Sequence, residues 1–147
     1  MDPLAVLTLI SEGLTLVDKF TEVTRRWFGK EKIPSVLARK EGDTLKIESE
    51  GQVREQIEAG KLEMSAWDEK RYKTLYEKVK VNFDMYNDID VQLPTASVDE
   101  KARLKQKLEN IRKELCKDFR EMIRIYENTL RVPLEDHYTL YDTCQDL

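Results

Sequence analysis

The sequence predicts a mostly α-helical fold, an antiparallel bundle of three long helices with a short C-terminal helix. Charged residues make up 37% of the 147 residues and hydrophobic residues 40%, with only five glycines and four prolines. This composition suits helices better than a turn-rich β-sandwich or barrel. Apolar residues also recur at helical spacing over three long stretches. The length suits one core, so residues 1–147 are expected to form a single domain.

The first helix is expected over residues 3–28. Asp2 can cap its start, Pro3 suits the first helical position, and Gly29 is a natural end. Its polar side chains occupy a narrow arc, so we expect this helix to lie centrally and to contact at least two other elements. The apolar arc includes Val6, Leu7, Leu9, Ile10, Leu14, Leu16, Val17 and Phe20, and the polar arc includes Asp18.

The segment after the first helix predicts a small β-hairpin over residues 35–48. Two short apolar runs flank the turn-like residues Gly42 and Asp43, as in a tight hairpin. A short helix over residues 52–59 is expected to follow and to end at Gly60.

Two further helices begin at capping-box patterns. Ser65 precedes Asp68, and Ser97 precedes Glu100, at the spacing that lets the Ser side chain cap the helix. We expect helices over residues 66–90 and 98–131, the first fraying near its acidic end at Asn87. The short link between them predicts an antiparallel helical hairpin. A tail over 134–147 is expected to carry the short C-terminal helix.

Two surface features are candidates for partner binding. Three apolar residues lie off the main seam of the second helix, and four basic residues form a stripe opposite the seam of the third. Nearby glutamates neutralise much of that stripe, so an ordinary solvated face competes with a surface for an acidic partner or lipid headgroups. The candidate residues are Trp67, Val81, Met85, Lys113, Lys117, Arg120 and Arg124.

Residues that could support catalysis or bind metal are sparse. His137 has no companion ligand or nucleophile, and Asp84 with Asp88 lacks the glycine of a calcium loop. Cys116 and Cys144 match no metal spacing and are expected to be free thiols in a reducing compartment. We therefore expect no enzyme activity, no cofactor, no metal and no small-molecule substrate.

The leading functional hypothesis is a non-catalytic helical module for protein–protein interaction or assembly, either free-standing or terminal in a larger protein. Unequal helix lengths leave part of the third helix uncovered, so a second copy is one candidate partner. The alternative is a membrane-active or membrane-recruiting effector domain that uses the apolar N-terminal helix. A third reading, an enzyme using carboxylates and His137, has less support.

The net charge of −4 argues against nucleic acid as a partner. The apolar run near the N-terminus lacks a basic flank and is shorter than the roughly 20 residues that cross a bilayer. The expected localisation is therefore cytoplasmic, with a membrane as a minor possibility.

Overall fold

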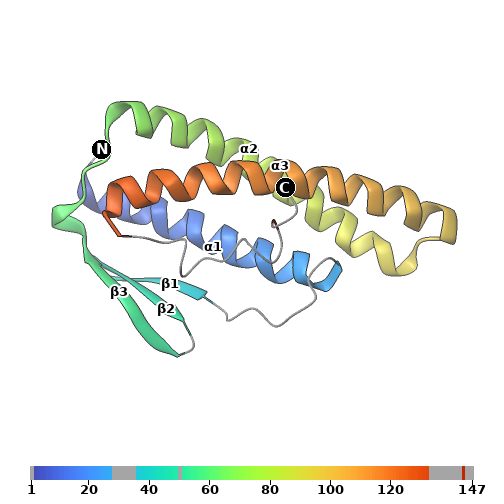
Figure 1. Cartoon of the computed structure of the whole chain (residues 1–147), viewed down its shortest axis with the longest axis horizontal. Helices are drawn as coiled ribbons and strands as arrows, with labels where there is room; N and C mark the ends of the chain where they lie inside the picture. The colour runs from blue at the N-terminus through green and yellow to red at the C-terminus, as the bar shows by residue number, and fades with distance from the viewer. Residues whose placement is uncertain (1, 28–35, 50, 133–143, 145–147) are drawn as a thin grey trace.

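The fold combines three helices with a three-stranded antiparallel sheet (Figure 1). The structure is a computed structural model, and it describes residues 2–27, 36–49, 51–132 and 144. The elements are α1 (Pro3–Trp27), β1 (Val36–Glu41), β2 (Thr44–Ser49), β3 (Gln52–Glu58), the 3-10 turn η1 (Ala59–Lys61), α2 (Ala66–Gln92), the 3-10 turn η2 (Leu93–Thr95) and α3 (Val98–Leu130).

The expected bundle of three long helices plus a short C-terminal helix is wrong. The chain is mostly α, but one side of α1 packs against the sheet, and its other side packs against α2 and α3. The apolar arc of α1 is too wide to be buried by one neighbour. The helices α2 and α3 cover part of this arc, and the strands cover the rest. The short helix expected within 134–147 falls outside the described residues, apart from Cys144.

The sheet has the order β1-β2-β3, and its first two strands form the expected hairpin. Gly42 takes a φ of 60° in the turn, a conformation that favours glycine. The short helix expected over 52–59 is wrong, because these residues form β3 along β2. Val53 and Ile57 are four residues apart, a spacing that fits one face of a helix or of a strand, and pairing with β2 decides between them.

The core is formed where α1 lies between the sheet and the other two helices. Asp2 caps α1 through a hydrogen bond from the Ala5 amide, 2.9 Å from its carboxylate. The Phe20 ring contacts the rings of Phe83, Tyr86 and Phe119. Residues from all three layers are fully buried, and they include Leu7, Ile10, Leu14, Phe20, Leu45, Ile47, Tyr72, Leu115, Phe119 and Tyr126. The arc on α1 is therefore core.

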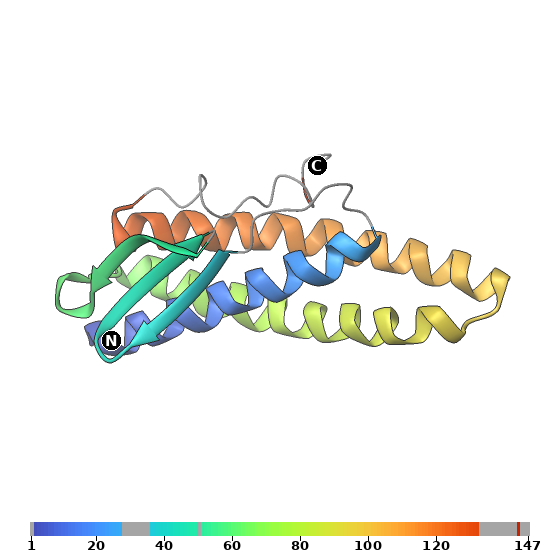
Figure 2. The same cartoon turned by 90° about the horizontal axis from the view of Figure 1, so that it is seen from below.

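The helices α2 and α3 form the expected antiparallel hairpin, and their starts are confirmed. Ser65 accepts from the Asp68 amide, and Ser97 accepts from the Glu100 amide. The expected fraying near Asn87 is wrong, because α2 continues to Gln92 and then tightens into η2. The 27 residues of α2 and the 33 of α3 carry the hairpin well past the end of α1 (Figure 2).

Candidate interaction surface

An exposed apolar stripe runs along the side of α2 that α1 does not cover. Trp67, Val81 and Met85 have exposed fractions of 72%, 60% and 49%. At about 100° per residue they lie on a different side of α2 from Phe83 and Tyr86, which face α1. We call this side of α2, together with the adjoining side of α3, the outer face.

A groove with a volume of about 500 Å³ opens on the outer face. It lies toward the end of the α2–α3 hairpin that extends past α1 (Figure 2). Its apolar residues come from both helices, and polar residues from both helices surround them. The apolar set is Met85, Ile89, Leu104 and Ile111, and the polar set is Asp88, Gln92, Lys107 and Asn110. The groove is thus an apolar depression bordered by both signs of charge, the form that suits a helical partner better than a small anion.

Ion pairs join α2 to α3 elsewhere on the outer face. Arg71 Nη2 lies 2.7 Å from Glu121 Oε1. Lys78 Nζ lies 3.2 Å from Glu114 Oε2 and 3.2 Å from Asp118 Oδ2. Hydrogen bonding to Asp118, then to Glu114, raises the pKa of Lys78 above its usual value. In these pairs α2 provides the base and α3 provides the acid.

The signs are reversed at the groove. Asp88 provides the acid from α2, and Lys107 provides the base from α3. Within the described part of the chain, no ion pair within 4.0 Å joins either residue to another, whereas Lys78 and Arg71 are paired. Among the described residues, the groove therefore presents an acid and a base that no ion pair occupies.

The basic stripe of α3 adjoins the outer face at Glu121, whose carboxylate pairs with Arg124 of the stripe at 3.4 Å as well as with Arg71 of α2. Lys113, Lys117 and Arg124 are exposed, as expected of a solvated side. Arg120 departs from that expectation, because it is half-buried and donates from Nη2 to the Cys144 carbonyl at 2.6 Å. Apart from this link through Glu121, the described residues do not join Lys113, Lys117 and Arg120 to Trp67 in one patch.

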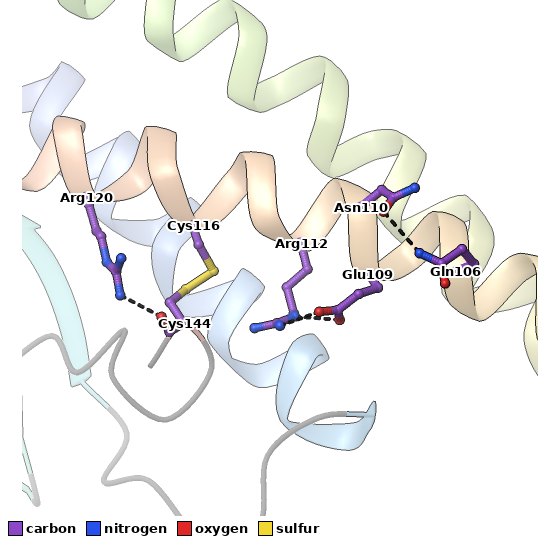
Figure 3. Close-up of polar contacts among 7 residues, drawn as sticks. All are labelled: Gln106, Glu109, Asn110, Arg112, Cys116, Arg120 and Cys144. Carbon is purple, nitrogen blue, oxygen red and sulfur yellow. Dashed lines mark hydrogen bonds and ion pairs between the residues drawn. A yellow bond between two sulfur atoms is a disulfide. The ribbon is translucent and has the colours of Figure 1, made fainter. Parts of the chain in front are cut away.

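A disulfide ties the tail to α3 beside this stripe (Figure 3). Cys116 and Cys144 are bonded, with their Cα atoms 5.7 Å apart, so the expectation of free thiols is wrong. Sequence spacing cannot show it, because the two cysteines are 28 positions apart and the bond requires Cys144 to lie against α3. One turn before Cys116, the buried Arg112 makes two hydrogen bonds to Glu109, at 2.9 and 2.6 Å.

Metal and catalytic sites receive no support from the described residues. Among residues 2–27, 36–49, 51–132 and 144, no group of three or more His, Cys, Asp and Glu side chains is placed to hold a metal ion. The Asp84 and Asp88 pair is therefore not part of such a group there. His137 lies outside the described residues. The absence of a cofactor and of enzyme activity stays a prediction.

Comparisons with known proteins leave the surface as the main guide to function. No family model, curated protein or solved structure matches the chain. The outer face and its groove are therefore the features of the chain that bear on its function.

Proposed function

We propose that this chain is a non-catalytic protein–protein interaction or assembly module that binds its partner on the outer face of the α2–α3 hairpin. The exposed stripe of Trp67, Val81 and Met85, which leads into the groove, carries the proposal. Val81 lies one helical turn from Met85, which lines the groove, and Trp67 lies about 21 Å further along the same side. Exposed apolar side chains beside an apolar groove are typical of docking surfaces. A tryptophan there adds the kind of anchor that dominates binding energy at many interfaces.

The membrane alternative has weaker support from the described residues. It needs the apolar arc of α1, and Val6, Leu7, Ile10, Leu14, Val17 and Phe20 are all buried. Exposing these side chains would open the core and forfeit roughly 1.5–3 kcal/mol for each one that is transferred to water. Within the described residues, no helix is long and apolar enough to cross a membrane.

Two exposed valines on α2 provide a matched test of the interaction surface. Val81 lies on the outer face at 60% exposure, and Val91, about 80° around the same helix, is 75% exposed and does not line the groove. Proteins captured with the wild-type chain are identified, purified and titrated against wild type, Val81→Glu and Val91→Glu by calorimetry. We expect Val81→Glu to weaken binding by about tenfold or more, since a charge enters an apolar contact. Val91→Glu should bind as wild type does.

Equal affinities for the two variants would overturn the outer face as the docking surface. Circular dichroism of both variants serves as the folding control, since substitutions at exposed helix positions change stability little.

The cytoplasmic localisation is also part of the proposal, and the disulfide bears on it. Disulfides persist in oxidising compartments and are rare in a reducing cytoplasm. Rapid alkylation of intact cells, followed by mass spectrometry of Cys116 and Cys144, tests the location. Two alkylated thiols would support the cytoplasmic location, and a persistent Cys116–Cys144 bond, as the structure has it, would argue for an oxidising compartment.

A further inference from the structure

The outer face carries opposite charges on its two helices at three successive levels. Arg71 of α2 lies beside Glu121 of α3, and Lys78 lies beside Glu114. At the groove the order is reversed, and Asp88 of α2 lines the same depression as Lys107 of α3. At each level the named side chain of α2 is therefore opposite in charge to that of α3, and at the first level Glu121 also pairs with Arg124 of its own helix.

We propose that a second copy of this chain docks on the outer face, related by a two-fold axis that runs along the groove, parallel to α2 and α3. This rests on the proposed function and names its partner. Such an axis places α2 of one copy over α3 of the other at the same level. Each acid or base then meets its opposite in the partner, and the contact occurs twice because the interface is the same patch on both copies.

The helix directions suit this arrangement. α2 and α3 are antiparallel within one chain, and the axis also makes α2 antiparallel to α3 of the second copy (Figure 1). The two hairpins together would form a four-helix bundle in which every pair of neighbouring helices is antiparallel, as in bundles with up-and-down topology. The helix dipoles of neighbours then oppose one another, which is the favourable arrangement.

The apolar residues of the groove supply the driving force for the contact. Met85 and Ile89 of one copy would cover Leu104 and Ile111 of the other. The two-fold axis repeats this contact with the roles of the two copies exchanged. The α1 helix and the sheet do not obstruct this contact, because α1 packs on the side of α2 that carries Phe83 and Tyr86.

The mixed charge favours a second copy over other occupants. A nucleic acid or an anionic lipid surface would repel the carboxylates of Asp88, Glu114 and Glu121 on this face. A foreign helix would need its own matching pattern of both signs, whereas the chain itself already has that pattern.

Charge exchange at the groove tests the proposal. In Asp88→Lys, the new lysine of one copy would face Lys107 of the other copy. In Lys107→Asp, the new aspartate of one copy would face Asp88 of the other copy. Either variant alone should weaken dimerisation by about tenfold or more, because like charges meet twice. An equimolar mixture should restore it, since both cross-chain contacts are then of opposite sign. The double variant Asp88→Lys/Lys107→Asp should also recover.

The measurement is sedimentation velocity of the full chain over a range of concentrations, with circular dichroism to check that each variant folds. Asp84→Lys is the matched control, because Asp84 is exposed on α2 and does not line the groove. It should associate as wild type does. A wild-type chain that stays monomeric at several hundred micromolar would overturn the second copy as occupant.

A mixture of the single variants that remains as weak as each variant alone would overturn the proposed axis. These failures are distinct from failure of the proposed function. A monomeric chain that binds another protein through Val81 keeps the interaction module and assigns the face to a different partner. A monomer for which Val81→Glu and Val91→Glu bind alike loses both proposals.

Discussion

The hydroxyl oxygens of Tyr72 and Tyr126 lie 2.9 Å apart in the core. Tyr72 donates its proton to the Leu9 carbonyl at 2.8 Å, so the hydrogen bond between the two hydroxyls has Tyr126 as donor. Burial raises the pKa of Tyr72 above its usual range. These contacts join α1, α2 and α3 at one point.

Replacing Tyr72 with Phe should lower the free energy of unfolding by about 1–3 kcal/mol, because the substitution removes the buried hydroxyl that donates to the Leu9 carbonyl and accepts from Tyr126. Denaturant unfolding followed by circular dichroism measures the change. Tyr76→Phe is the matched control, because Tyr76 is only partly buried and no described residue hydrogen-bonds its hydroxyl. A similar loss in both variants would contradict the role of the buried pair.

Gly13 lies directly against this pair, and its lack of a side chain makes the approach possible. A Cβ at Gly13 would clash with the Tyr126 and Tyr72 hydroxyls. Gly13→Ala should destabilise the fold by about 1–3 kcal/mol, despite the better helix propensity of alanine. Gly60→Ala is the control, since a Cβ there meets nothing within 4 Å.

Coupling between the two positions gives a sharper measurement. Tyr126→Phe removes the atom nearest to the added methyl group, so Gly13→Ala should cost less in the Tyr126→Phe background. The double-mutant cycle should yield a coupling of about 0.5–3 kcal/mol. Additive effects would mean that the Gly13 clash is relieved elsewhere.

Local signals predicted the helix starts, whereas contacts between distant residues set the rest. Ser65 and Ser97 cap helices with amides three residues away, so the pattern suffices. The strand β3 depends on pairing with β2, and the sequence spacing of Val53 and Ile57 does not distinguish it from a helix. The disulfide likewise depends on where the tail returns.

The sequence predicted the exposed residues of the candidate surface but not its groove. The spacing of Trp67, Val81 and Met85 placed them off the main seam of α2, and all three are exposed. The groove requires the relative placement of α2 and α3, which no single helix pattern contains. The involvement of Arg120 with Cys144 depends on the tail, so charge patterning alone assigned it to solvent.

The Cys116–Cys144 bond should stabilise the chain mainly by restricting the unfolded state. For two cysteines 28 residues apart, loop-closure entropy predicts a loss of about 3–4 kcal/mol on reduction. Thermal unfolding with and without a reducing agent measures the loss. The Cys116→Ala/Cys144→Ala variant should unfold like the reduced wild type and should not respond to the reductant. A reductant effect on that variant would show that the agent acts elsewhere.

Asp18 should make stability depend on pH, because it connects α1 to the sheet from a partly buried position. Its carboxylate accepts a hydrogen bond from the backbone of Ala38 on β1. Burial raises its pKa from the ordinary value of 3.8 to about 8, although this hydrogen bond acts in the opposite direction. Between these values the folded chain keeps a proton that the unfolded chain has released.

Stability should therefore be greatest near and below pH 3.8 as far as this group is concerned, and should fall as pH rises toward 8. The contribution is up to about 1.4 kcal/mol per pH unit within that window, and it levels off above the folded pKa.

Asp18→Asn keeps an oxygen acceptor for the Ala38 amide but cannot ionise. The variant should gain stability over wild type with increasing pH, measured by denaturant unfolding at several pH values. The exposed-residue control Asp84→Asn should retain the slope of wild type. A constant difference between Asp18→Asn and wild type across the window would show that Asp18 does not titrate there, and that the contact between α1 and β1 tolerates the charge.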